Sequence, residues 1–214
     1  MATLKVAVVD YGAGNLRSVA KALARSGAEP CVTSDPEAVR RADAVVLPGV
    51  GAFADAVRRL DQAGLDDALR DSIAAGRPYL GLCLGLQLLF EESDEHGRTP
   101  GLCLLPGRVA RFPERDAAGG KLRVPHIGWN EVRFAGSHPV LEQLPAADHF
   151  YFVHAYRALA ADPADVVGRA EYGGEFASAV ARENLFAVQF HPEKSQAAGR
   201  RLLDAWVAWA GACA

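Results

Sequence analysis

The stretch Tyr-Leu-Gly-Leu-Cys-Leu-Gly-Leu-Gln at residues 79–87 places Cys83 between two glycines. This Gly-x-Cys-x-Gly pattern is the thiol counterpart of the Gly-x-Ser-x-Gly nucleophile elbow, in which a strand turns sharply into a helix. The flanking residues must be small, because a Cβ on either side would collide at the bend. The bend presents the thiol at a helix N-terminus, where the dipole and free N–H groups favour a thiolate. The pattern predicts a nucleophile at Cys83, although by itself it fits a buried structural cysteine about as well.

Around this stretch, short apolar segments alternate with helical patterns through the first half of the chain. The predicted strands are residues 4–9, 30–33, 44–47 and 78–82, and the predicted helices are residues 15–26, 35–41, 52–60, 65–75 and a helix from Leu84 to about Glu92. Such alternation indicates βαβ units and a parallel sheet. We therefore expect an α/β fold with a doubly wound, mostly parallel sheet flanked by helices.

The second half of the chain has a different pattern, of short strands separated by turns. The predicted strands are residues 109–112, 130–134, 149–153, 166–171, 177–182 and 186–190, and a closing helix with one apolar face follows at residues 199–210. These strands predict an additional antiparallel layer or an extension of the sheet. The polar residues 113–120 predict a surface loop. Since no linker or repeat is visible, we expect residues 1–214 to form a single domain.

The composition is that of an ordinary soluble globular protein, with 50% hydrophobic and 23% charged residues among 214. Lysine and arginine number 23 against 26 aspartates and glutamates, and the net charge of −3 argues against nucleic acid or an anionic membrane as partner. No apolar run is long enough to span a bilayer, and no secretory signal is visible near Lys5. We therefore expect a cytoplasmic protein.

Four cysteines are present, and none of them has metal-type spacing such as Cys-x-x-Cys. Free thiols in a reducing compartment are the expected state. Cys83 has an elbow around it, whereas Cys103 lies in an apolar segment that predicts a place in the core. No second histidine or cysteine stands at ligand spacing from a first, so we predict neither a metal nor a cofactor.

A nucleophilic cysteine needs a base, and the base needs an orienting group. Phe-His-Pro-Glu at residues 190–193 supplies both, directly after a predicted strand. In extended backbone, residues two apart project to the same side, so we expect the Glu193 carboxylate to hold the His191 imidazole. A lone histidine at a strand end is more often structural. Its occurrence together with the cysteine elbow makes a Cys83–His191–Glu193 triad the better interpretation.

Acyl transfer at a thiol also needs N–H donors for the developing oxyanion. Pro-Gly-Val-Gly at residues 48–51 follows a strand, at the edge where open α/β sheets place their sites. The backbone of Gly49, Val50 and Gly51 is one candidate donor, although this segment alone also fits an ordinary tight turn. The N–H of Leu84, the residue after the nucleophile, is the other candidate.

Tyr-Gly-Ala-Gly-Asn at residues 11–15 looks only superficially like a dinucleotide-binding loop. Arg17 stands where the third glycine of Gly-x-Gly-x-x-Gly belongs, so no nucleotide site is inferred. A turn, or a surface read by a partner, is the better interpretation.

Six segments together resemble the class I (triad) glutamine amidotransferases. They are Asp-Tyr-Gly-Ala-Gly-Asn-Leu-Arg-Ser-Val at 10–19, Pro-Gly-Val-Gly-Ala-Phe at 48–53, Gly-Leu-Cys-Leu-Gly-Leu-Gln at 81–87, Val-Pro-His-Ile-Gly-Trp-Asn at 124–130, Tyr-Phe-Val-His at 151–154 and Gln-Phe-His-Pro-Glu-Lys-Ser at 189–195. They run in order along essentially the whole chain. The elbow and His-Pro-Glu are general to that family, whereas Tyr-Gly-x-Gly-Asn, His-Ile-Gly-Trp-Asn and His-Pro-Glu-Lys-Ser resemble its imidazole glycerol phosphate synthase glutaminases.

The resemblance implies a reaction on glutamine. Cys83 would attack the side-chain amide, ammonia would leave, and water would hydrolyse the γ-glutamyl thioester to glutamate. Gly51 and Gln87 would lie near the glutamine, and the backbone at Ala155 and Tyr156 would hold its α-amino and carboxylate groups. Many relatives carry a hydroxyl residue at position 155, so alanine is a mild departure from the family pattern.

The resemblance also implies a partner, a separate (β/α)8-barrel cyclase subunit that forms a heterodimer with this chain and uses the ammonia in histidine biosynthesis. Asn15, Trp129, Tyr151 and Lys194 match family positions at or near that contact. From the residues alone, Lys194 is equally a surface charge and Trp129 a core aromatic. Because free ammonia protonates in water, we expect the open face of the Cys83 site to dock on the barrel.

Three other functions are compatible with part of this evidence. A glutaminase subunit of another synthase, such as the one serving pyridoxal phosphate synthesis, would share the triad but not the Tyr-Gly-x-Gly-Asn and Gly-Trp-Asn segments. A stand-alone γ-glutamyl hydrolase would work without a partner. A catalytically silent binding module of the same fold would have no need of an intact cysteine, histidine and glutamate.

Overall fold

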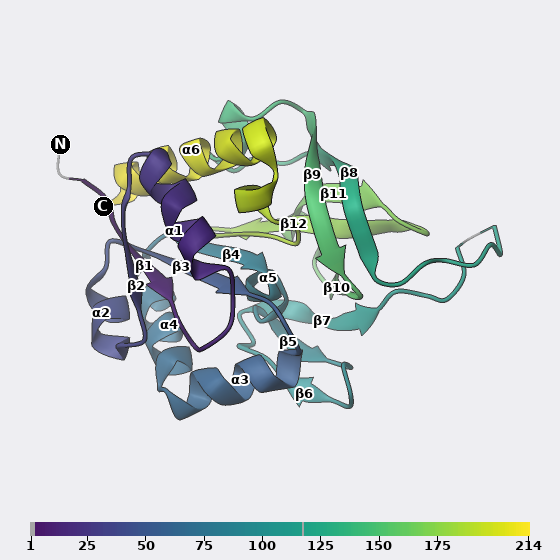
Figure 1. The fold of residues 1–214 in the computed structure, drawn as a ribbon, viewed down its shortest axis with the longest axis horizontal. Helices are drawn as coiled ribbons and strands as arrows, with labels where there is room; N and C mark the ends of the chain where they lie inside the picture. Colours follow the sequence, from purple (N-terminus) through teal and green to yellow (C-terminus); the bar gives the residue numbers. More distant parts are fainter. Residues whose placement is uncertain (1–2, 117) are drawn as a thin grey trace.

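A mixed β-sheet forms the centre of the protein, whose computed structural model describes residues 3–116 and 118–214 (Figure 1). Its parallel part has the order β2–β1–β3–β4–β13, formed by Glu29–Thr33, Lys5–Val9, Ala44–Gly49, Tyr79–Cys83 and Leu185–Val188. Beyond β13 the sheet continues through β12 (Glu175–Arg182), β10 (Tyr156–Ala160), β7 (Leu105–Arg111), β5 (Phe90–Ser93) and β6 (Thr99–Pro100). These later pairs are antiparallel except β5–β7. The sequence-based expectation of an α/β fold is confirmed.

Helices cover both faces of the parallel strands (Figure 1). α1 and α6 lie on one face and α2, α3 and α4 on the other, with bounds Leu16–Arg25, Gln196–Cys213, Pro36–Arg41, Phe53–Gln62 and Leu65–Ala74. Alternate residues of β1 feed the two cores: Val6 and Val8 are buried with α1 and α6, whereas Ala7 and Val9 are buried with the other helices. This division follows from the two-residue period of a strand that is buried on both faces.

An antiparallel layer branches from this sheet at β12, in agreement with the antiparallel strands predicted for the second half of the chain. β11 (Val166–Glu171) pairs with β12 and with β8 (His126–Phe134), and β8 pairs in turn with β9 (Ala147–His154). Figure 1 shows β8 and β9 as long strands next to α6. The layer is fixed to the main core by aromatic packing, in which the rings of Phe150 and Phe190 stack with centroids 4.0 Å apart.

The helix predicted from Leu84 to about Glu92 is wrong beyond its first turn. α5 ends at Gln87, and the chain then enters β5. The backbone after α5 bonds to a neighbouring segment instead, with the N–H of Leu102 donating to the carbonyl of Leu88 at 2.8 Å. Every residue of α5 and the next three are buried. The sequence therefore offers no polar face by which to distinguish a helix from a strand.

Two smaller expectations also need correction or completion. Cys103, predicted to lie in the core, is exposed and has a φ of 52°. The strands β5, β6 and β10 were missed, because they are short or lack a clear alternation of buried and exposed residues.

In the predicted loop at residues 113–120, residue 117 lies outside the described residues, and Arg115 forms an isolated bridge with Lys121. None of the described helices is long and apolar enough to cross a membrane.

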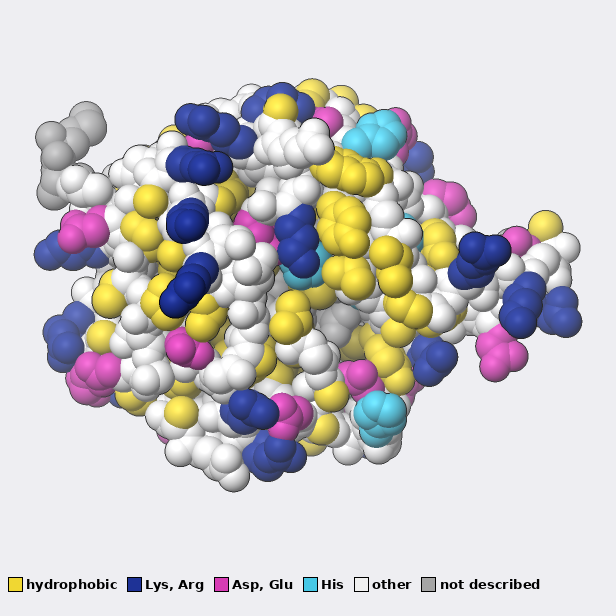
Figure 2. All heavy atoms as spheres, in the orientation of Figure 1, with side chains coloured by type: hydrophobic (Ala, Val, Ile, Leu, Met, Phe, Trp, Pro, Cys, Tyr) yellow, Lys and Arg dark blue, Asp and Glu magenta, His cyan; other side chains and the backbone are white. Residues whose placement is uncertain are grey.

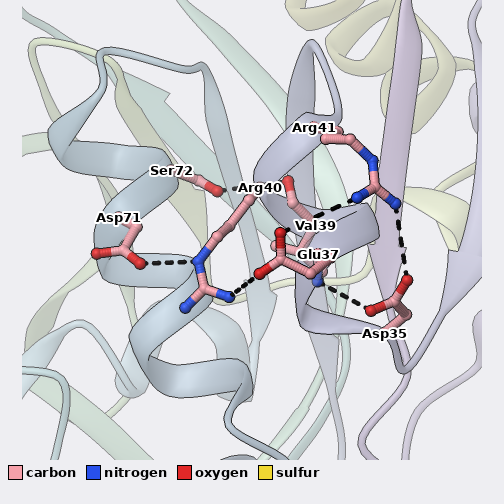
Figure 3. A network of polar contacts seen from close by, with 7 residues as sticks. All are labelled: Asp35, Glu37, Val39, Arg40, Arg41, Asp71 and Ser72. Atoms are coloured by element: carbon pink, nitrogen blue, oxygen red, sulfur yellow. Dashed lines mark hydrogen bonds and ion pairs between the residues drawn. The ribbon is translucent and has the colours of Figure 1, made fainter.

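A network of exposed charges links α2 to α4 (Figure 3). Arg40 donates through Nε to Asp71 at 2.8 Å and through Nη1 to Glu37 at 2.8 Å. Asp35 caps α2 by accepting from the N–H of Glu37 at 2.9 Å. These contacts lie at the surface, where ion pairs contribute little to stability.

Candidate active site

Cys83 stands at the bend between β4 and α5 in a strained backbone conformation. Its φ of 54° and ψ of −102° are rare for a residue other than glycine. The bend depends on glycine at both flanks: a Cβ on Gly85 would lie 1.9 Å from the carbonyl oxygen of Leu47, and one on Gly81 would lie 2.6 Å from that of Gly85. The steric reason predicted for the two glycines is confirmed. Strain of this kind persists where the surrounding structure enforces it, and it clusters at functional sites.

The predicted oxyanion segment lies directly beside the nucleophile. Gly49 is the register partner of Cys83 in the β3–β4 pair. No side chain fits at Gly49, because a Cβ there would lie 2.6 Å from the hydroxyl of Tyr11 and 2.8 Å from the Cβ of Leu84. The chain then leaves the sheet through an exposed Val50 and a glycine, Gly51, with a φ of 100°. The candidate donor backbone thus sits next to the thiol at the carboxyl ends of β3 and β4.

The carboxylate of Glu193 holds the imidazole of His191. Nδ1 of His191 lies 2.9 Å from Oε1 of Glu193, and the two side chains are 4% and 1% exposed. The contact was predicted, but the reason given for it was wrong. Pro192–Lys194 form a short 3-10 helix, η3, so the two residues meet across a turn rather than along extended backbone. With Nδ1 engaged by the carboxylate, the other ring nitrogen is buried and unpaired among the described residues, and it is available for proton transfer.

The surroundings of His191 favour its protonated form. Burial disfavours the imidazolium, but the interactions with the Cys83 sulfur and the Glu193 carboxylate outweigh it and raise the pKa of His191 to about 10. An imidazolium beside a thiolate is the ion pair that activates a cysteine nucleophile. In the structure, the charge of His191 is therefore coupled to both Cys83 and Glu193, the other two residues of the predicted triad.

Backbone contacts to β9 fix the turn that carries His191 and Glu193. The N–H of His191 donates to the carbonyl of Tyr151 at 2.9 Å. The hydroxyl of Ser195 accepts from the N–H of Tyr151 at 3.0 Å and donates to the carbonyl of His191 at 2.6 Å. Ser195 is fully buried, so no water competes for these bonds. The position of this turn is consequently tied to the strand that carries Tyr151.

Two of the predicted substrate-binding positions meet beside the thiol. The side-chain amide of Gln87 donates to the carbonyl of Tyr156 at 3.0 Å and to Oε1 of Gln189 at 3.1 Å. Gln189 in turn donates to the sulfur of Cys83 at 3.6 Å. The backbone at Ala155 is held in place too, because its carbonyl accepts from the N–H of Phe112 at 3.0 Å.

Three of the four predicted interface residues form one cluster. The rings of Trp129 and Tyr151 pack edge to face with centroids 6.3 Å apart, and the ammonium of Lys194 lies 5.9 Å from the centre of the Tyr151 ring. Trp129 is 48% exposed, so the alternative that it is a core aromatic is wrong. Figure 2 shows hydrophobic side chains gathered over β8 and β9, with a basic and a histidine side chain at their edge. Asn15, the fourth, is the N-cap residue of α1.

The sequence analysis assigned no role to two residues that lie near Cys83. Tyr11, taken as part of a turn or a partner surface, is buried against Gly49, and burial together with the charge of Cys83 raises the pKa of its hydroxyl above the usual range. Gln189 was quoted as part of a motif but given no role. The signal for Gln189 was a polar side chain at the end of an apolar strand, one residue before Phe190. A partner for such a group is expected when it is buried.

Comparisons with known proteins show the family of the chain. The family model described as glutamine amidotransferase class-I matches residues 7–207. The chain belongs to the class-I glutamine amidotransferase family. The imidazole glycerol phosphate synthase subunit HisH of Methylococcus capsulatus is 54% identical over 209 residues, covering 95% of this chain and 96% of that one. The subunit of the same name from Aromatoleum aromaticum is 51% identical over 210 residues, covering 96% and 98%.

This class-I glutamine amidotransferase also shares its fold with solved structures. A structure described as a glutamine amidotransferase superposes with a TM-score of 0.73 at 23% identity, covering 96% of this chain and 98% of that one. PurLQS from Thermotoga maritima gives a TM-score of 0.71 at 19% identity, covering 97% and 99%. At these identities the likeness concerns the fold. The full-length similarity to HisH subunits favours a glutaminase of that type over the other members that the sequence left open.

Proposed function

We propose that this amidotransferase hydrolyses glutamine through a thioester on Cys83. The thiolate attacks the side-chain amide carbon, and the imidazolium of His191 gives its proton to the departing ammonia. The neutral imidazole then takes a proton from water, which attacks the thioester and releases glutamate. The observation that carries this proposal is the strained elbow at Cys83 beside a buried His191–Glu193 pair. Glu193 orients the imidazole and supports its charge.

The oxyanion of each tetrahedral intermediate needs donors in a fixed place. We assign this role to the backbone of Gly49, Val50 and Gly51 and to the N–H of Leu84. The support is the register of Gly49 with Cys83 and the close packing that allows no Cβ at Gly49. Gln87 and the backbone at Ala155 and Tyr156 are assigned to glutamine binding, on the grounds that the Gln87 amide bonds the Tyr156 carbonyl next to the thiol. None of these steps requires a metal or a cofactor.

The ammonia is proposed to pass to a (β/α)8-barrel cyclase subunit, with which the chain forms the heterodimer of imidazole glycerol phosphate synthase in histidine biosynthesis. The exposed cluster of Trp129, Tyr151 and Lys194 supports this docking face. Because Tyr151 bonds the catalytic turn through both of its backbone groups, a partner bound at this cluster acts directly on the position of His191. Asn15, at the N-cap of α1, is assigned to the same interface.

Two further parts of the proposal concern the chain as a whole. One domain carries the function, and the support is that one continuous sheet pairs strands from both halves of the chain. A reducing compartment such as the cytoplasm is the proposed location, since all four cysteines are free.

Glutamate release from glutamine tests this function. The rate is measured with the subunit alone, then with the barrel cyclase, and then with the cyclase and its ribonucleotide ligand. Stimulation by the loaded cyclase is expected. Equal rates in all three conditions would contradict the coupling and indicate a partner-independent amidohydrolase, and no release in any condition would contradict the glutaminase chemistry itself.

A further inference from the structure

A series of polar contacts leads from β8 to Cys83 and involves two buried histidines outside the triad. It begins at Asn130, whose amide orientation is fixed by backbone partners. The Nδ2 group donates to the carbonyl of Glu171 at 2.8 Å, and Oδ1 accepts from the N–H of Glu131 at 2.9 Å. The second hydrogen on Nδ2 faces Nε2 of His126 at 3.4 Å. Because an amide nitrogen only donates, this nitrogen of His126 must accept.

That single constraint determines the tautomer of both histidines. With Nε2 accepting, neutral His126 carries its proton on Nδ1 and donates it to Nε2 of His154, 3.1 Å away. His154 then carries its own proton on Nδ1, which lies 2.8 Å from the carbonyl oxygen of Tyr156. The carbonyl is an acceptor, so this final assignment is independently consistent. The donors thus all point one way, from Asn130 toward Tyr156.

The Tyr156 carbonyl joins this chain to the catalytic sulfur. It accepts from His154 and also from the amide of Gln87 at 3.0 Å. The same Gln87 nitrogen donates to Oε1 of Gln189 at 3.1 Å, which turns the amide nitrogen of Gln189 toward Cys83 at 3.6 Å. Both amide orientations are therefore set by the carbonyl that His154 holds, and the last donor of the series points at the sulfur.

The surroundings keep both histidines neutral and in place. His126 and His154 are buried, and the ring of His154 packs against Phe112 with centroids 5.2 Å apart. Burial lowers the pKa of His126 to about 4, and burial with the charges of neighbouring histidines lowers that of His154 to about 3. A second proton on either ring would also place two donors face to face at the 3.1 Å contact. At neutral pH the tautomers are consequently fixed.

We propose that His154 is a positioning residue of the glutaminase: its Nδ1–H holds the Tyr156 carbonyl, and through Gln87 and Gln189 it holds an N–H donor on the sulfur of Cys83. This inference rests on the proposed function, since it concerns the same thiolate. A donor to the sulfur stabilises negative charge on it and favours one rotamer of the side chain. His154 acts through other residues and touches neither the sulfur nor the substrate amide.

Two substitutions at His154 distinguish positioning from packing. Asparagine places its side-chain NH2 close to where Nδ1–H lies and keeps the donor to Tyr156, whereas phenylalanine fills the ring space among aromatic neighbours and has no donor. If His154 positions the carbonyl, His154→Phe lowers kcat/KM for glutamine by about 10- to 100-fold, and His154→Asn stays within about fivefold of wild type. If the ring merely fills space, His154→Asn has the lower kcat/KM and His154→Phe stays close to wild type. His138→Phe is the matched control, because His138 is a buried histidine that makes none of these hydrogen bonds. It is expected to leave kcat/KM for glutamine unchanged.

The measurements use the complex with its cyclase, with glutamine and separately with ammonium as nitrogen source. Ammonium-dependent turnover is expected to be equal in all variants, which shows that each is folded and assembled. The rate of Cys83 alkylation by iodoacetamide is expected to fall in His154→Phe and to persist in His154→Asn. Equal glutamine rates for His154→Phe and wild type, or the reversed order, would overturn the positioning role. Cys83→Ala is run alongside: full glutamine turnover in that variant would overturn the proposed function instead.

Discussion

Two polar networks in this protein use similar contacts in opposite surroundings. Near Cys83, the side chains of His154, Gln87 and Gln189 are buried and make hydrogen bonds of 2.8 to 3.6 Å. Between α2 and α4, Arg40 bonds two carboxylates at 2.8 Å at the surface (Figure 3). Removing a buried partner leaves a polar group unsatisfied, whereas water replaces a lost partner at the surface. Contact distance is therefore a poor guide to importance, and burial is a better one.

The largest expected effect is at the elbow itself. Gly85→Ala would place a Cβ 1.9 Å from the backbone of Leu47, and backbone cannot move aside as a flexible side chain can. We expect a loss of more than about 3 kcal/mol in the free energy of unfolding, or no folded protein. Urea unfolding checks this, with Gly211→Ala as the control, because nothing lies within 4 Å of a Cβ at Gly211. Equal midpoints for the two variants would show that the elbow tolerates a side chain.

The next effect separates the orienting group from the nucleophile. Glu193→Gln keeps the shape of the side chain but removes the charge that supports the imidazolium of His191. We expect kcat for glutamine to fall by about 10²- to 10⁴-fold, less than on loss of Cys83 or His191. The apparent pKa of the imidazolium is also expected to fall, since the carboxylate helps to raise it. A near wild-type kcat in steady-state assays would contradict the orienting role.

A smaller effect tests the buried histidines through pH. His126 has a folded pKa of about 4, below its unfolded value, so the unfolded state binds more protons between pH 7.5 and 5.5 and stability falls as the pH falls. The raised pKa of His191 acts in the opposite direction over the same window, so wild type is compared with His126→Gln, which retains His191. Between these two pH values wild type is expected to lose about 1.4 kcal/mol more than the variant. Identical losses in chemical denaturation would mean that His126 titrates normally.

The smallest effect is expected in the surface network. Arg40→Ala breaks both of its ion pairs, but its carboxylate partners stay hydrated. The thermal midpoint is expected to remain within about 2 °C of wild type. A much larger fall in the thermal midpoint, measured by calorimetry, would show that exposed ion pairs stabilise this protein as strongly as buried hydrogen bonds do.

The elbow was predictable because its logic is local. A cysteine between two glycines at the end of an apolar strand carries its own steric explanation, and the contacts at Gly81 and Gly85 match it. The His191–Glu193 contact was also predictable, since a single residue separates the two, although the turn between them was expected to be extended backbone. Short-range geometry constrains such pairs whichever local conformation they adopt.

The other residues of the site come from segments far apart in the sequence, so local sequence patterns could not predict that they lie together. Tyr11 comes from the end of β1, Gln189 from the end of β13 and His154 from the end of β9, and only the sheet order brings them to Cys83. The extent of α5 was misjudged for a related reason. Its residues are buried on every side, so tertiary pairing with the following segment, and not periodicity, decided where the helix ends.

The role of Cys83 is tested most directly by comparing wild type with Cys83→Ala in the assembled synthase, using glutamine and then ammonium as nitrogen source. The variant is expected to lose glutamine-dependent synthesis and glutamate release but to keep ammonium-dependent synthesis at the wild-type rate. Cys31→Ala, at an exposed cysteine far from the elbow in the sequence, serves as the matched control and should behave as wild type. Glutamine-dependent turnover near the wild-type rate in Cys83→Ala would contradict the central claim that this thiol is the nucleophile.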